Sequence, residues 1–385
     1  MSTFYVPNAL LGENLRLEKD IYIEINENGI IQKISKESLE EPSIEFPPNF
    51  LLIPGFINPH THVGDAFLKD QGYGKTLDEV VGTEGLKHKK LNASSTEELE
   101  TSIVNSLNLL VSNGYTSFLD CREGGISGVN LLKRLLLNFP LRGLILGRPF
   151  GNDDINEIFH SGNGFSFSDV FSINETIANQ ANQLKNSLPF SLLSIHVSEN
   201  EEIVSRSYSK FNQRDIPLAL DLLDLNFVVH ATYANEEDLD LLKKKDVGVI
   251  SCPQSNMYFG SSFPPIEQVL EKDIILGLGT DNVMISNPNP FRLMAFTLNA
   301  ARSFEQNITP KEILKAITVN PGIIFGKKIG QIEEGFSADF VGINLANQNV
   351  LYSKDVYTAI TLRAGVTDIF FQMLKGKIIK WKDQR

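Results

Sequence analysis

Four of the six histidines in this chain lie at the ends of apolar runs. His60 and His62 follow the apolar residues 51–57 and are two positions apart, so both rings point to one face if this run is a strand. Two imidazoles on one face can bind one metal ion. For these two residues alone, a pair of hydrogen-bonded structural histidines is the alternative interpretation.

Two more histidines and one carboxylate occupy equivalent positions. His196 and His230 each end an apolar run, and Asp281 follows the run 277–280. In barrels of parallel strands, active sites lie at the carboxyl ends of the strands. Randomly placed histidines would fall mostly in helices and surface loops, so this pattern favours a metal site.

The rest of the sequence predicts the strands that would position these residues. Apolar runs alternate with amphipathic stretches such as 96–112 and 219–223, which is typical of a parallel sheet covered by helices. Eight strands are expected, at 51–58, 116–121, 141–148, 164–168, 192–196, 226–230, 247–252 and 274–279. The count favours a closed (β/α)8 TIM barrel of the α/β class, with a doubly wound sheet as the alternative.

Both ends of the chain are predicted to form β-structure. Short runs at 20–25 and 29–34 flank a turn sequence that is typical of a hairpin. Similar runs return at 338–343, 369–373 and 376–380. We therefore expect residues 1–51 and 329–385 to form one composite β-sandwich domain, and residues 52–328 to form the barrel.

Composition limits the class of partner. The 385 residues include 35 basic and 47 acidic side chains, and the net charge of -12 argues against a nucleic-acid partner. Neither a secretory leader nor a run of about 18 apolar residues is present, which predicts a cytoplasmic protein that does not enter a membrane. Cys121 and Cys252 are expected to be buried thiols. A small molecule is the expected partner, and a homodimer is allowed for.

Several motifs together resemble the amidohydrolase superfamily. They are Pro54-Gly55-Phe56-Ile57-Asn58-Pro59-His60-Thr61-His62, His196-Val197-Ser198-Glu199, His230, Cys252-Pro253-Gln254-Ser255-Asn256, Gly277-Leu278-Gly279-Thr280-Asp281-Asn282 and the segment 330–339. The chain is most similar to the branch that contains cytosine deaminase, S-adenosylhomocysteine deaminase and the triazine chlorohydrolases. The match runs in order through most of the chain.

This resemblance implies a single divalent metal. Its ligands would be His60, His62, His196 and Asp281, with zinc as the expected ion and iron as the alternative. Such a metal lowers the pKa of a bound water towards about 7 and so provides a hydroxide nucleophile. The binuclear branch bridges two metals with a carboxylated lysine from the fourth strand, and residues 165–169 contain no lysine.

The resemblance also implies the acid–base residues. Glu199 would carry the proton of the water to the substrate, although acidic residues also favour helix starts. His230 would orient the hydroxide and stabilise charge on the intermediate, with a role as fifth metal ligand as the alternative. Asp281 would accept a proton from the water.

Four other residues are candidate substrate contacts. Arg148 ends the third strand, where it would bind an anionic or carbonyl group or, equally, form a structural ion pair. Glu84 belongs to a polar segment, 64–92, that we expect to overhang the pocket with its other charges in solvent. Ser168 ends the fourth strand. Asn256 would brace the loop after the eighth strand or bond to the local backbone.

The function implied by the resemblance is hydrolysis of a non-peptide carbon–nitrogen bond in a cyclic amidine. Water would replace the exocyclic amine of a pyrimidine, a purine or a related nucleoside or base, with release of ammonia. Residues 164–169 lack the histidine that many purine-type deaminases carry there, which argues against an adenosine-type substrate; the nearby His160 is expected at the surface.

Two other functions are weighed against deamination. A cyclic amide hydrolase or a chlorohydrolase would use the same metal site. A non-catalytic barrel scaffold is the third alternative, but it would have no physical need for all six residues of the site.

Overall fold

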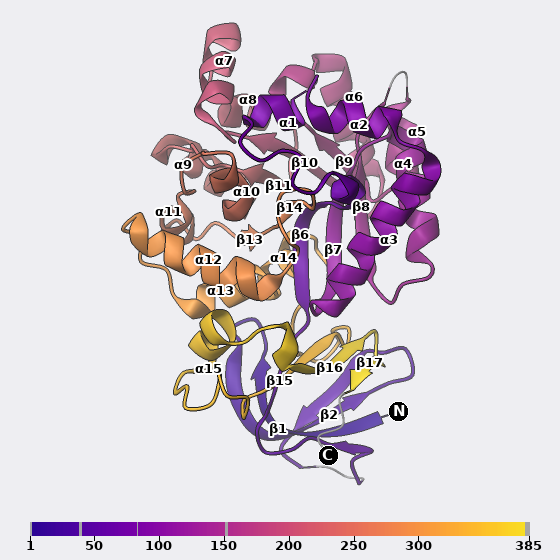
Figure 1. Cartoon of the computed structure of the whole chain (residues 1–385), viewed down its shortest axis with the longest axis vertical. Helices are drawn as coiled ribbons and strands as arrows, with labels where there is room; N and C mark the ends of the chain where they lie inside the picture. Colours follow the sequence, from indigo (N-terminus) through magenta and orange to yellow (C-terminus); the bar gives the residue numbers. More distant parts are fainter. Residues whose placement is uncertain (1, 38–40, 83, 151–152, 382–385) are drawn as a thin grey trace.

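The computed structural model describes residues 2–37, 41–82, 84–150 and 153–381. Two sheets organise these residues, a barrel sheet in the upper part of Figure 1 and a sheet built from both ends of the chain in the lower part. Helices surround the barrel sheet. Within the described residues, no helix is both long enough and apolar enough to cross a membrane.

The barrel sheet contains only parallel pairs. Its strands follow one another in chain order from β6 (Phe56–His62) to β13 (Leu276–Leu278), and the short β14 (Asp281–Asn282) pairs with β6. Because only two residues separate β13 from β14, they are two pieces of one eighth strand, and the sheet closes on itself. The intervening strands are β7 (Tyr115–Arg122), β8 (Arg142–Gly147), β9 (Gly164–Phe167), β10 (Leu192–Val197), β11 (Phe227–His230) and β12 (Gly248–Ser251). The predicted barrel is confirmed.

The first predicted strand, residues 51–58, is in fact two strands. Residues Phe50–Pro54 form β5, which belongs to the terminal sheet, and β6 of the barrel begins at Phe56. Gly55 lies between them, where an added Cβ would come within 2.2 Å of the Thr116 side chain. The sequence did not separate the two strands because both are buried along their whole length. The barrel therefore starts at Phe56 rather than at residue 52.

The helices follow the strands around the outside of the barrel. The longest, α3 (Thr96–Ser112), matches the predicted stretch, and its first turn is capped by Ser95, whose hydroxyl accepts a hydrogen bond from the Glu98 N–H. Its apolar face is buried. The other helices of the barrel region are α1 (Leu77–Val81), α2 (Leu86–Ala93), α4 (Gly125–Leu136), α5 (Ile155–Ser161), α6 (Glu175–Ser187), α7 (Glu201–Phe211), α8 (Asp215–Leu222), α9 (Glu236–Lys244), α10 (Pro253–Tyr258), α11 (Ile266–Glu271), α12 (Pro290–Ser303), α13 (Pro310–Ala316) and α14 (Val319–Ile324).

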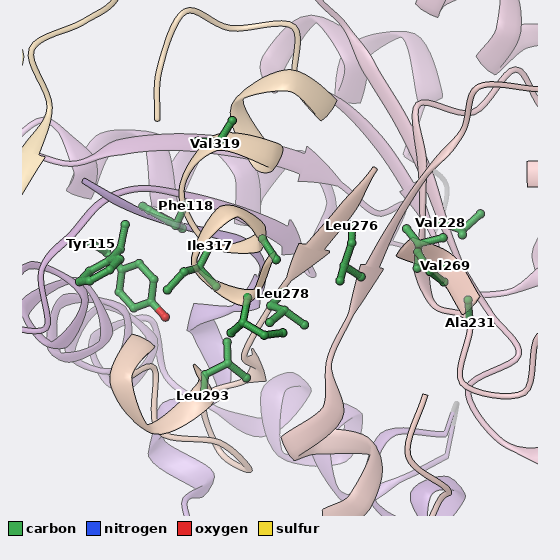
Figure 2. Packing of buried hydrophobic residues seen from close by; sticks show 14 of the residues in the cluster. Tyr115, Phe118, Val228, Ala231, Val269, Leu276, Leu278, Leu293, Ile317 and Val319 are labelled. Carbon is green, nitrogen blue, oxygen red and sulfur yellow. The ribbon is translucent and has the colours of Figure 1, made fainter. Parts of the chain in front are cut away.

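Alternate residues of the barrel strands face two apolar cores. In β7, Phe118 packs in the layer between strands and helices, whereas Leu119 packs inside the barrel. Figure 2 shows part of the outer layer, in which Leu278 of β13 lies next to Leu293 of α12, and Phe118 and Leu276 belong to the same cluster. Both cysteines are fully buried in the inner cluster, as predicted.

The terminal sheet joins the two ends of the chain. Its order is β17-β16-β15-β5-β1-β2-β3, so β5 connects the N-terminal strands to the C-terminal ones, and β4 pairs with β1. The two halves share one apolar core, in which the Phe46 ring stacks on Phe50 at 3.9 Å and also contacts Phe371 and Trp381. The elements are β1 (Ser2–Leu11), β2 (Arg16–Ile25), β3 (Ile31–Ser35), β4 (Ile44–Glu45), β15 (Phe340–Asn344), α15 (Val356–Thr358), β16 (Ile369–Leu374) and β17 (Lys377–Trp381).

Candidate active site

The carboxyl ends of the barrel strands bring five of the predicted residues together. His60 and His62 come from β6, His196 from β10, His230 from β11 and Asp281 from β14. All five are buried, and the most exposed of them, His196, has only 7% of its surface accessible. The His60 ring lies 5.0 Å from that of His62 and 4.9 Å from that of His196, measured between centroids.

The positions of the donor atoms fit one metal ion. Asp281 Oδ1 lies 3.2 Å from His60 Nε2 and 3.4 Å from His62 Nε2. In a tetrahedral zinc site with bonds of about 2.0–2.1 Å, neighbouring ligand atoms are roughly 3.3–3.4 Å apart. Donor atoms of His60 and His196, together with Cys121, and those of His60, His230 and Asp281 also cluster within 4.8 Å. This donor set of imidazole and carboxylate suits a divalent transition metal.

Burial keeps the imidazoles in the state that a metal requires. It lowers the pKa of His60 and lowers that of His62 to about 3. Burial, followed by the neighbouring Arg148, also holds the pKa of His196 well below its usual value. The rings are therefore neutral at pH 7, and neutral imidazole is the form that binds metal.

Hydrogen bonds leave Nε2 of His196 as the acceptor nitrogen. Its Nδ1 lies 3.0 Å from the Phe167 carbonyl oxygen, which accepts a hydrogen bond and so assigns the proton to Nδ1. Nη2 of Arg148 lies 2.9 Å from His196 Nε2 and 3.1 Å from its Nδ1, so the guanidinium contacts both nitrogens of this ring. Arg148 therefore faces a proposed metal ligand directly, in addition to lining the cavity described below.

Glu199 lies just beyond β10 and outside the next helix. Helix α7 begins at Glu201, and Asn200 caps it by accepting a hydrogen bond from the Ile203 N–H. The carboxylate of Glu199 is 3.5 Å from His230 Nε2, and burial raises its pKa. Glu199 is therefore not part of the start of α7, where Asn200 is the cap and Glu201 and Glu202 are the acidic residues of the first turn.

The loop after β12 supports the site from behind. Ser255 donates a hydrogen bond of 2.6 Å to Asp281 Oδ2, and Asn256 Nδ2 lies 3.2 Å from His230 Nδ1. The expectation that Asn256 would brace the loop of Asp281 is thus wrong by one residue, because α10 turns Ser255 toward Asp281 and Asn256 toward His230. Asn256 is buried and does not line the cavity.

A cavity of about 480 Å³ lies above the strand ends. His62, His196, Glu199, His230 and Asp281 contribute to its lining. The predicted substrate contacts Arg148 and Ser168 also line it, and its apolar wall comes from Leu77, Val81, Phe150, Phe165, Phe167, Phe171, Ile177 and Ile203. An apolar wall with a few convergent polar groups is typical of a site for a small organic ligand.

The segment between β6 and α3 covers part of this cavity, as predicted, but through other residues than expected. Glu84 is exposed and is absent from the cavity lining, whereas Leu77 and Val81 of α1 and Lys87 and His88 of α2 belong to it. Lys87 is only 2% exposed, so the expectation that the other charges of this segment are solvated is wrong for this residue. Helix α2 has no clear apolar stripe that would have indicated which side is buried.

The charged end of β7 was also missed. Asp120, Arg122 and Glu123 are all buried, and Glu123 lines the cavity. Asp120 Oδ1 accepts hydrogen bonds from the Val63 N–H at 2.6 Å and from the Thr61 hydroxyl at 3.2 Å. The sequence did contain a signal for these residues. Three charged side chains lie at or just after the carboxyl end of a barrel strand, which is where active sites of barrels lie.

Known proteins of similar sequence cover nearly the whole chain. The family model described as Amidohydrolase family matches residues 51–380. A putative aminohydrolase of Methanothermobacter thermautotrophicus is 32% identical over 368 residues, which are 92% of this chain and 93% of the relative. A 5-methylthioadenosine/S-adenosylhomocysteine deaminase of Caldicellulosiruptor saccharolyticus is 25% identical over 407 residues, with 96% and 90% covered.

Solved structures share the fold at lower identity. An adenosine deaminase from Xanthomonas campestris with bound zinc has a TM-score of 0.83 at 19% identity, covering 98% of this chain and 92% of that structure. Atrazine chlorohydrolase from Arthrobacter aurescens, complexed with zinc, has a TM-score of 0.85 at 15% identity, with 99% and 95% covered. Because the family model spans most of the sequence, the chain belongs to the amidohydrolase family.

Proposed function

We propose that the protein is a metal-dependent hydrolytic deaminase of a heterocyclic amidine, which is a pyrimidine, a purine or a related nucleoside or base. The carrying observation is that His62, His196, Glu199, His230 and Asp281 line one cavity of about 480 Å³. The sixth residue, His60, is buried directly beside them, 3.2 Å from Asp281 Oδ1. Relatives named as deaminases support this reaction class. A small molecule is the proposed partner; the cytoplasmic location and the homodimer stay predictions.

We assign one divalent metal to His60, His62, His196 and Asp281, with zinc as the ion and iron as the alternative. The separations of 3.2 and 3.4 Å between Asp281 Oδ1 and the two Nε2 atoms of β6 support this assignment. The bound metal would supply a Lewis acid that lowers the pKa of water, so that water becomes a nucleophile at neutral pH. Zinc is favoured because the two similar solved structures contain it.

The residues of the chain carry the protons of the reaction. The reaction adds water across the ring C=N bond of the amidine, then forms a C=O bond and breaks the bond to the exocyclic amine, so one proton of the water goes to the ring nitrogen and the other leaves with ammonia. Glu199 delivers the first, because burial raises its pKa and makes its protonated form available. Asp281 accepts the second, held in place by Ser255. His230 stabilises the negative charge that develops on the oxygen.

Substrate recognition is assigned to the outer part of the cavity. Ser168 and Arg148 line it and would bind polar substituents of the ring. Arg148 also lies 2.9 Å from His196 Nε2, so part of its role is structural. No role at the site is proposed for the exposed Glu84, and Asn256 acts through His230.

The test is a screen of metal-replete protein against purines, pyrimidines, pterins and their nucleosides, with ammonia as readout. Zinc and iron are measured on the same preparation. Release of ammonia from one compound, with about one metal per chain, is the expected result. Loss of chloride from a chlorinated triazine, or opening of a cyclic amide without ammonia, would instead identify the alternative reactions of the same site; the similarity to atrazine chlorohydrolase makes the triazine worth including.

A further inference from the structure

A buried carboxylate outside the proposed ligand set contacts both the proposed metal site and helix α2, which covers part of the cavity. Glu123 follows β7 and is 7% exposed. Its Oε1 lies 2.6 Å from His62 Nδ1 and 2.5 Å from Lys87 Nζ. Arg148 and Arg122 each place a guanidinium nitrogen 4.0 Å from the same carboxylate. Glu123 is therefore the centre of a buried charge network, and a proposed metal ligand is part of it.

The geometry determines which nitrogen of His62 is free to bind a metal. Nε2 faces Asp281 Oδ1 at 3.4 Å, so the nitrogen next to Glu123 is Nδ1. A negative carboxylate 2.6 Å from Nδ1 favours the form of the ring that carries its proton on Nδ1 and its lone pair on Nε2. Such carboxylate partners fix the orientation of a metal-binding histidine and make its other nitrogen a better ligand.

Lys87 makes an ionised Glu123 tolerable in the interior. Burial by itself opposes ionisation of this carboxyl, but the Lys87 ammonium lies 2.5 Å from Oε1 and supplies the counter-charge. Lys87 is almost completely buried, and its second acidic neighbour is Asp65, at 3.8 Å. Buried charges persist only where they are paired, so Lys87 and Glu123 depend on each other.

We propose that Glu123 is a positioning residue for His62, and that Lys87 holds Glu123 in place from the covering helix α2. This inference rests on the proposed metal site. It gives α2, which carries none of the proposed ligands, a part in retaining the metal. If the ion pair only attached α2 to the barrel, its removal would leave the metal affinity unchanged.

Two double variants separate these roles. Removing one charge alone would leave the other buried and unpaired, so both are removed together. Lys87→Met/Glu123→Gln keeps an oxygen that can accept from His62 Nδ1, whereas Lys87→Met/Glu123→Leu does not. The two variants lack the same charges, and only the glutamine variant keeps an amide group beside His62. The exposed pair Lys89→Met/Glu97→Gln is the matched control.

The measurement is the zinc dissociation constant of metal-free protein, by competition with a chromophoric chelator. We expect a rise of about 10- to 100-fold for the leucine variant, a smaller rise for the glutamine variant and no change for the control. Equal constants in the two double variants, or a wild-type constant in the leucine variant, would overturn the positioning role. If circular dichroism shows the leucine variant unfolded, Lys87→Met/Glu123→Met takes its place, because it also removes the acceptor, and a wild-type constant in that variant has the same meaning. Wild-type protein that binds no zinc would instead refute the metal site itself.

Discussion

Buried carboxylates of the site fall into two electrostatic groups. Asp281 and Glu123 lie against imidazole or ammonium groups, and although burial opposes ionisation, these neighbours hold their pKa values well below normal. The pKa values of Glu199 and Asp65 are raised instead, and burial is the largest cause in both cases. Asp281, which would bind the metal and accept a proton, must start ionised, whereas Glu199, which would deliver a proton, must start protonated. The environments match the roles assigned to Asp281 and Glu199.

Replacing Glu199 by glutamine should separate proton transfer from metal binding. The Glu199→Gln variant keeps its shape and hydrogen-bonding capacity but cannot carry a proton. We expect the zinc content to stay at the wild-type level and kcat for ammonia release to fall by about 10²- to 10⁴-fold. Turnover equal to the wild type would remove Glu199 from its assigned role, and loss of zinc would make it a ligand.

Asp65 should make the fold less stable as the pH rises toward neutrality. Burial raises the pKa of this carboxyl from 3.8 to about 7, so the folded chain binds the proton more tightly than the unfolded chain. Its contribution to stability is complete below about pH 4 and is lost as the pH rises to about 7, with a slope of at most roughly 1.4 kcal/mol per pH unit.

The corresponding test is the thermal midpoint of metal-free Asp65→Asn between pH 4 and 7. The midpoint of the variant should fall less steeply with pH than that of the wild type. Asp70→Asn, at an exposed position of the same segment, should follow the wild type. Parallel curves for Asp65→Asn and the wild type would contradict the shifted pKa.

At the scale of elements, the closure of the barrel places the ligands. Asn58 of β6 donates to the Thr280 hydroxyl at 2.7 Å and accepts from the Thr280 N–H at 3.2 Å. These bonds join the first strand to the interruption between β13 and β14. Asp281 follows directly, with a left-handed backbone at φ 61°, and so its carboxylate faces His60. The proposed metal ligation would therefore depend on the contact between the first and the last strand.

A methyl group at Gly279 should disturb this contact. A Cβ added there would lie 2.8 Å from His60 Cβ and 3.0 Å from its carbonyl oxygen, which forces the two strands apart. We expect Gly279→Ala to weaken zinc binding at least several-fold, measured as the dissociation constant. Gly365→Ala is the control, since its nearest neighbour would be 3.9 Å away. Unchanged affinity in Gly279→Ala would show that the strands can adjust freely.

The sequence predicted those elements whose pattern is local. Even β9, expected from the short alternation around Phe165, is a strand that pairs with both neighbours. The boundary between β5 and β6 was missed, because a run that is buried throughout carries no polar mark where the chain passes from one sheet to the next. Lys87 was missed for a different reason. Its burial depends on Glu123, which is 36 positions away in the sequence and comes close only when α2 packs over the end of β7.

Across the whole molecule, one ion pair links the barrel to the terminal sheet. Arg142 at the start of β8 contacts Asp339 Oδ2 at 2.5 Å and donates to the hydroxyls of Ser337 and Ser117 at 3.0 Å. The other oxygen of Asp339 accepts from the Lys375 N–H. This junction lies at the amino ends of the strands, opposite the cavity, so stability and chemistry are spatially separated.

Replacing Arg142 should therefore lower stability without affecting the site. Arg142→Met leaves the buried Asp339 without its counter-charge, which is expected to cost about 3–5 kcal/mol. The thermal midpoint should fall clearly, while the zinc dissociation constant and the KM of the folded enzyme stay at wild-type values. A change in zinc affinity would mean that the terminal sheet influences the site.

The position of β5 also has a consequence for biosynthesis. It lies between β1 and β15, and five of its residues pair with β15. A ribosome that adds about 5–20 residues per second needs roughly 15–60 s for the roughly 290 residues between these two strands. During that time β5 presents an unpaired apolar edge on the nascent chain, and such edges promote association with other chains. Successful production of this enzyme therefore depends on keeping its N-terminal strands shielded until translation has passed the barrel.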